Sequence, residues 1–286
     1  MSGEIAVTLA VEQAMGLIAP LRATWLRTLL AELARIHSHL SYLSYLADEE
    51  LAARLWRAVD QVRDHLRDWS GNRVHPMLTR IGGLASPPPA GWLSATARLV
   101  AGFFPILDDL ETSLARRAAS LSGLGVADQS TCRGFGLSGP VSRAAGLNLD
   151  RRLRGYLAYP QLEVRPPTRS GGDAHDRFAV LLADVRQSCR LIEECLQGLP
   201  EGPVEVALSR RLKVPEGEHH SEIEAPWGIA GVLLVSRGGP TPWRLALRTP
   251  TFANVSALNR LLKGTELDLI PDVVASLGYA IGDLDK

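Results

Sequence analysis

The fold is decided by residues 21–46, which read LRATWLRTLLAELARIHSHLSYLSYL. Apolar side chains recur in this stretch at alternating spacings of three and four, which places them on one stripe of a long helix. The residues of the stripe are Leu26, Leu29, Leu33, Ile36, Leu40 and Leu43. The sequence therefore predicts a long helix that is buried along one face.

The same periodicity predicts further helices on both sides of this one. Their approximate ranges are 1–16, 48–69, 92–122 and 174–196. Asp48 is a good N-cap for the second of these helices, and Gly71 is a good C-terminal stop. Pro105 predicts a break or kink inside the third, because proline cannot donate a helical hydrogen bond.

The C-terminal third has a different pattern. A short apolar run at 229–235 is followed by Gly and Pro at 238–240, and then Trp243, Leu245 and Leu247 alternate with polar residues. This pattern predicts a β-hairpin with one buried face. A helix over 252–262 and a short one near Val273 are expected to follow.

Together these elements predict an α+β fold, mainly α, in which a long-helix bundle carries a small antiparallel hairpin or sheet near the C-terminus. We expect one domain over 1–286, with the helical bundle in 1–200, the β element in 201–250 and C-terminal helices in 251–286. Residues 123–172 are rich in Gly and Pro and poorly periodic, and a loop of that length is usually functional or an interface.

Composition excludes several classes of protein. The 31 basic and 31 acidic residues give no net charge, which argues against a nucleic-acid binder. The three cysteines form no C-x-x-C, and His219 and His220 are adjacent with no further ligands at useful spacing, so no metal site is expected. The chain contains no apolar run of membrane-spanning length, so any contact with a membrane is expected to go through another subunit.

Two groups of polar residues could have a function. Glu32, Arg35 and His39 lie three and four residues apart, on a row beside the buried stripe of the long helix. The alternative interpretation is a solvated Glu–Arg–His ladder. The second group is the loop at 71–83, where Gly and Pro fix the backbone around His75 and Arg80 and allow close approach to a cofactor or a partner. The alternative there is an ordinary tight turn.

Four stretches together resemble one family. They are LRTLLAELARIHSHL (26–40), GNRVHPMLTRIGGL (71–84), EAPWG (224–228) and PWRLALRTPTFANVSALNRLLKG (242–264), which continues to DVVASLGYAIGDLDK (272–286). Their order and spacing resemble those of the D-type subunit of NADH–quinone oxidoreductase, also called the 49 kDa type, which is related to the large subunit of nickel–iron hydrogenases.

The resemblance also indicates the branch of the family. Hydrogenase large subunits hold nickel and iron with two C-x-x-C motifs, and this chain has none, so hydrogen chemistry by this chain alone is excluded. Members of the complex I branch carry an N-terminal β region whose histidine and tyrosine are associated with the quinone headgroup, and this chain begins after both. The family motif E-A-P-R-G has Trp227 in place of its arginine.

The resemblance implies roles for four residues. His39 matches the family position close to the terminal iron–sulfur cluster of a neighbouring subunit, where a histidine can take up a proton on reduction. Arg35 and Glu32 would orient it or balance its charge, and Arg80 lies in a motif that packs in the same region. The chain itself is expected to bind no cofactor, whereas a quinone and a partner-held iron–sulfur cluster are expected in the complex.

The expected function is that of one subunit in a membrane-associated NADH–quinone oxidoreductase, which forms part of the wall between that cluster and the quinone site and is inactive alone. The expected partners are an iron–sulfur small subunit of the B type, a further subunit of the C type and membrane subunits, at the cytoplasmic face of the membrane. The alternatives are a non-catalytic structural or assembly paralogue and a component of a membrane-bound hydrogenase-like complex.

Overall fold

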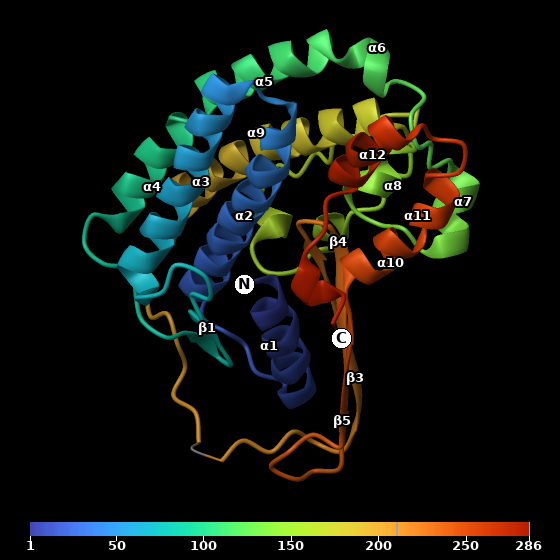
Figure 1. Ribbon diagram of the computed structural model, residues 1–286. Helices are drawn as coiled ribbons and strands as arrows, with labels where there is room; N and C mark the ends of the chain where they lie inside the picture. Colours follow the sequence, from blue (N-terminus) through green and yellow to red (C-terminus); the bar gives the residue numbers. More distant parts are fainter. Residues whose placement is uncertain (210, 286) are drawn as a thin grey trace.

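The computed structural model describes residues 1–209 and 211–285, and its centre is helix α2 (Leu21–Leu43). The whole predicted stripe of this helix is buried, and it contributes to the largest hydrophobic cluster of the molecule. Helix α2 packs most extensively against α9 (Ala174–Gly198), which crosses it in Figure 1. The predicted long central helix is confirmed, and a single 3-10 turn, η1 (Ser44–Leu46), ends it.

Helix α3 (Glu49–Ser70) returns alongside α2 and has the predicted ends. The Asp48 carboxylate accepts a hydrogen bond from the Leu51 backbone N–H at 3.0 Å, and Gly71 adopts the left-handed conformation with φ 75°. The helix predicted over 92–122 is divided into three segments: α4 (Trp92–Ala101), α5 (Phe104–Arg116) and α6 (Ala118–Leu121). The main break precedes Pro105, which lies in the first turn of α5, where a missing N–H costs nothing.

Residues 123–172 are less irregular than their composition suggests. They contain four short helices: α7 (Gln129–Phe135), α8 (Pro140–Ala144), η2 (Arg151–Arg154) and η3 (Tyr159–Gln161). Each is too short to show a periodic pattern. This segment brings Arg143 and Arg152 into the interior, where both are fully buried.

The C-terminal sheet has three antiparallel strands in the order β3 (Gly217–Ala225), β4 (Gly228–Ser236) and β5 (Arg244–Arg248). The predicted hairpin is the β4–β5 pair, and the prediction missed β3, whose sequence GEHHSEIEA is mostly polar. A second, two-stranded sheet pairs β1 (Thr79–Arg80) with β2 (Gly83–Leu84).

The predicted buried face of the hairpin is wrong. Trp243, Leu245 and Leu247 are 62, 45 and 40% exposed. The physical reason is that α1 (Ser2–Met15) covers β3 and β4, where it packs on Ile223 and Val232, and leaves the edge strand β5 uncovered (Figure 1).

The chain ends in short helices. They are α10 (Pro250–Ser256), α11 (Leu258–Leu261), η4 (Leu267–Leu269), α12 (Ile270–Leu277) and η5 (Ile281–Asp283). Helix α10 contacts β4, and α12 packs against α9. The helix predicted over 252–262 is thus two short helices, and the one near Val273 is α12. Among the described residues, no helix combines the length and the apolar character that crossing a membrane needs. The α+β class, mainly α, is confirmed.

Candidate functional site

A cavity of about 710 Å³ lies where α1, α2, the loop before β1, the β3–β4 turn and the C-terminal segment meet. Besides α1, five segments of the chain line it. They contribute Ala34, His37 and Ser38 from α2; Arg63 and Leu66 from α3; Arg73, Val74, His75 and Pro76 from the loop; Ala225, Pro226, Trp227, Ala230, Gly231 and Val232 from the β3–β4 hairpin; and Leu247, Arg248, Thr249, Pro250, Ala280 and Asp283 from the C-terminal part. The lining is mainly apolar with a few polar groups, which is typical of a ligand site.

Helix α2 holds the β3–β4 turn in place by its polar row. Arg35 donates to the carbonyl oxygens of Glu224 (2.8 Å) and Ala225 (3.1 Å). His39 Nε2 lies 2.9 Å from the carbonyl oxygen of Pro226. Because a carbonyl oxygen can only accept, Nε2 carries the proton and donates it. Two side chains of α2 therefore fix three successive carbonyl groups in the wall of the cavity.

This bond defines the state of the His39 ring. Burial lowers the pKa of His39 to about 4, against the raising effect of the Asp184 charge, so the imidazole is neutral at pH 7. Its other nitrogen, Nδ1, is buried and has no hydrogen-bond partner among the described residues. The ring thus keeps one free acceptor in the interior.

Trp227 closes the turn on the side of α2. Its ring centroid lies 5.1 Å from that of His39 and 4.8 Å from that of Tyr42, the latter in an edge-to-face arrangement. Gly278 approaches the indole so closely that a Cβ there would overlap the ring. The Trp227 carbonyl oxygen also accepts from the Asn254 side chain at 2.9 Å. The indole therefore packs between His39, Tyr42 and Gly278, and the absence of a side chain at Gly278 leaves room for it.

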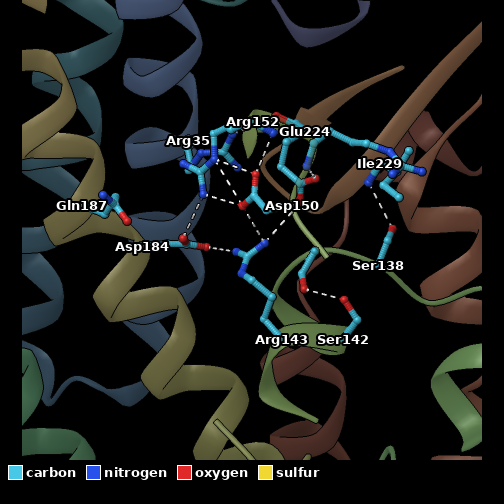
Figure 2. A network of polar contacts seen from close by, with 12 residues as sticks. Arg35, Ser138, Ser142, Arg143, Asp150, Arg152, Asp184, Gln187, Glu224 and Ile229 are labelled. Carbon is cyan, nitrogen blue, oxygen red and sulfur yellow. Dashed lines mark hydrogen bonds and ion pairs between the residues drawn. The ribbon is translucent and has the colours of Figure 1, made fainter. Parts of the chain in front are cut away.

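A cluster of buried ions lies directly behind the turn, and Figure 2 shows most of its members. We define the ion cluster as three arginines and four carboxylates whose side chains are almost completely buried. The members are Arg35, Arg143, Arg152, Glu32, Asp150, Asp184 and Glu224. They come from α2, α8, α9, β3 and the segment around η2, so the cluster joins most parts of the fold.

The carboxylates of the ion cluster differ in their surroundings. Burial tends to raise the pKa of Glu32, but Arg35, Arg152 and hydrogen bonds from Ser188 and Tyr159 outweigh it and lower that pKa to about 2. At Glu224, burial and the nearby Asp150 charge outweigh Arg143 and raise the pKa to about 7. Both shifts follow from the balance between desolvation and paired charge.

Three of the four residues singled out from the sequence lie together. Glu32, Arg35 and His39 are all fully buried, so the interpretation of a solvated ladder is wrong. Arg80 has an exposed side chain on β1, and its carbonyl oxygen accepts from the buried Arg27 at 2.6 Å. His75 and Arg73 of the loop line the cavity.

The sequence pattern did not indicate Arg143, Asp150, Arg152 or Asp184, and Glu224 stood out only as part of a motif. Several of their partners lie far away in the chain, since Arg143 pairs with Asp184 and Glu224, and Arg152 pairs with Glu32. The available signal was arginine and aspartate in a Gly-rich segment without helical pattern, which does not by itself indicate burial.

Among the residues that the structure describes, one group has oxygen and nitrogen atoms close enough for a metal ion: Asp173, His175 and Asp176. The two carboxylates already have other roles. Asp173 caps α9 by accepting from the Asp176 N–H and also accepts from the Gly123 N–H, and Asp176 accepts from the Gly171 N–H. We interpret this group as a set of backbone caps.

Comparison with known proteins gives consistent matches over the whole chain. The family model for the 49 Kd subunit of respiratory-chain NADH dehydrogenase matches residues 51–211 and 206–286. The NADH-quinone oxidoreductase D 2 subunit of Salinispora arenicola is 44% identical over 298 residues, which cover 100% of this chain and 77% of that protein. The D 1 subunit of Streptomyces coelicolor is 39% identical (100% and 78% covered), and the D subunit of Carboxydothermus hydrogenoformans is 33% identical (100% and 80%).

Proposed function

Since the chain belongs to the family of the D-type subunit of NADH–quinone oxidoreductase, the 49 kDa subunit of respiratory-chain NADH dehydrogenase, we propose that it forms part of the wall between a quinone site and the terminal iron–sulfur cluster of a partner subunit. One observation carries the proposal. The four stretches of sequence that resemble the family, although far apart in the chain, all supply residues to one cavity.

The cavity suits the headgroup of a quinone. Its volume of about 710 Å³ lies in the usual range for small-molecule sites. The lining offers apolar contacts from Val74, Pro226 and Trp227, and polar groups that include His37 and His75. His37 accepts a hydrogen bond from Arg63 at 2.9 Å, and burial followed by the Arg63 charge lowers the pKa of His37 to about 4, so this imidazole is neutral.

The proposed partners are an iron–sulfur small subunit of the B type, a further subunit of the C type and membrane subunits, with this chain bound peripherally at the cytoplasmic face of the membrane. The uncovered strand β5, on which Leu245 and Leu247 are exposed, the exposed Trp243 just before it and the open side of the cavity all suit contacts with other subunits. In this proposal the chain is inactive alone, because electrons reach the quinone from the partner.

Purification of the tagged chain from its own membranes tests this assignment. We expect a complex that contains a cluster-bearing small subunit and membrane subunits, and that reduces quinone with NADH. Co-purification with a small subunit that lacks the cluster would favour a structural paralogue. Hydrogen-dependent activity of the complex would favour a hydrogenase-like assembly. Recovery of the chain without any partner would contradict the proposal.

We further propose that Glu32, Arg35 and His39 lie beside the partner's cluster, with Arg80 in the same region. The free Nδ1 of His39 fits this role, because it is an unoccupied proton acceptor whose low pKa a nearby gain of negative charge would raise. Arg35 would keep the ring in position through the turn that it binds together with His39.

Replacement of His39 by methionine tests this role. Methionine keeps approximate volume and removes the proton acceptor, so the midpoint potential of the partner's cluster in the assembled complex should lose most of its dependence on pH. Potentiometric titration of the cluster at several pH values measures this slope, and His37→Met is the matched control on the same helix. An unchanged slope in His39→Met would show that His39 only positions the turn.

A further inference from the structure

The ion cluster carries one more negative than positive group when all its members are ionised. Its three guanidinium groups face four carboxylates, and each of the seven side chains is at most 1% exposed. An uncompensated charge at such a depth is costly, because neither water nor a partner stabilises it. Binding of one proton by the cluster removes this cost.

The hydrogen bonds identify the carboxylate that is least compensated. Glu32 accepts from Arg35, Arg152, Tyr159 and Ser188. Asp150 accepts from Arg143 and, through several nitrogens, from Arg152. Asp184 accepts from both Arg143 and Arg152.

Glu224 has the weakest set of donors. Its Oε1 accepts from Arg143 Nη1 at 3.2 Å, and the same nitrogen lies 3.2 Å from Asp150. Its Oε2 accepts from the uncharged backbone N–H of Arg151 at 2.9 Å. Among the described residues, the one charged donor to Glu224 is thus a guanidinium nitrogen that also donates to Asp150. Each of the other acids in the ion cluster receives two or more hydrogen bonds from charged donors.

We propose that the ion cluster binds one exchangeable proton and that the Glu224 carboxyl group carries it. The balance is simple: the neutral acid loses a proton to solvent, and the cluster passes from neutral to a charge of −1. Burial and the charge of Asp150 raise the pKa of Glu224 to about 7, so both states are populated near neutral pH. The inference concerns this chain alone and requires neither a quinone nor a partner's cluster.

The groups around Glu224 on each neighbouring element are consistent with this assignment. They are Glu32, Arg35 and His39 on α2, Arg143 on α8, Asp184 on α9, Asp150, Arg151 and Arg152 around η2, Tyr156, Tyr159 on η3 and Glu222 on β3. The Tyr156 hydroxyl accepts from the Glu224 N–H at 3.1 Å, and its pKa is raised by burial, so it stays neutral. His39 is neutral as well, which leaves Glu224 as the group that titrates.

The proton lies next to the cavity wall. The Glu224 carbonyl group is held by Arg35, and the next residue, Ala225, lines the cavity. Loss of the proton strengthens the attraction of the Glu224 carboxylate for Arg35 and Arg143. A reaction in the cavity that consumes a proton would therefore have a reserve of one proton directly behind its wall.

Infrared difference spectroscopy of the full chain tests the proposal. We expect a carbonyl band of a buried protonated carboxyl group at about pH 6 that disappears by about pH 8.5. Glu224→Gln should remove this band, and Asp184→Asn should also weaken it, because three carboxylates then balance three arginines. Glu222→Gln, on the same strand but paired with Arg151 near the surface, should keep the band.

A second readout uses stability. A raised native pKa means that Glu224 contributes stability below its unfolded pKa, and that this contribution is lost as pH rises through about 7. As pH rises from about 4.5 to about 7, the free energy of unfolding of the wild type should therefore fall relative to that of Glu224→Gln.

Persistence of the band in Glu224→Gln, or its absence in the wild type at all pH values, would overturn the proposal. If the glutamine variant fails to fold, Glu224→Asp should shift the band, and an unshifted band would overturn the proposal equally.

Discussion

Replacing Arg143 by leucine is expected to lower the free energy of unfolding by about 3–5 kcal/mol. Arg143 is fully buried and pairs with Asp150, Asp184 and Glu224. Leucine leaves these carboxylates in the interior with too few donors, and the full cost of an unpaired buried charge then appears. Urea or thermal unfolding of the purified chain measures the loss.

The matched control is Arg54→Leu. Arg54 pairs with Asp109 at 2.7 Å, but the two side chains are 35 and 50% exposed, so the change should cost less than about 1 kcal/mol. The loss in Arg143→Leu should also become smaller at lower pH, because protonated carboxyl groups need no guanidinium partner. Equal losses in the two variants would mean that the ion cluster does not stabilise the fold.

Replacing Gly278 by alanine is expected to lower the free energy of unfolding by about 3 kcal/mol, which combines overpacking with a positive-φ backbone. Gly278 has φ +61°, and an added Cβ would overlap the six-membered ring of Trp227. The indole has little room to move, because it packs against His39 and Tyr42.

Two further variants separate the cost of overpacking from the cost of the backbone conformation. Gly264 has φ +82° and open space around it, so Gly264→Ala should show only the backbone cost of about 1–2 kcal/mol. Trp227→Leu removes the ring that the new Cβ meets, so the double variant with Gly278→Ala should be less destabilised than the sum of the two single changes. Strict additivity would show that the contact between Gly278 and Trp227 is not what requires glycine.

The sequence predicts the long elements well because their patterns are local. The stripe of α2, the Asp48 cap of α3 and the β4–β5 hairpin depend on residues a few positions apart. Helices α7 and α8 are too short for periodicity, and β3 is too polar for a strand pattern although one side of it is covered by α1. The exposure of β5 depends on how far α1 extends over the sheet, which no local pattern contains.

In the candidate site, too, some residues can be predicted from local patterns and others depend on the fold. Glu32, Arg35 and His39 can be grouped from their spacing on one helix, and the structure places all three in the interior. The ion cluster cannot be identified in this way, because several of its pairs join distant parts of the chain, such as Arg152 with Glu32 and Arg143 with Glu224. The convergence of the four motif stretches on one cavity also requires the fold, since each stretch alone shows only a loop, a turn or a helix face.

The most direct test of the cavity is to fill it. Ala34 lies on α2 and lines the cavity, so Ala34→Phe places a ring inside it and changes no member of the ion cluster. Ala53 on α3 is exposed, and Ala53→Phe is the matched control. In the assembled complex, NADH-dependent quinone reduction should fall at least about tenfold in Ala34→Phe and stay unchanged in Ala53→Phe, with the same subunits present in both. Full quinone reduction by a complete complex that carries Ala34→Phe would contradict the assignment of this cavity to the quinone site.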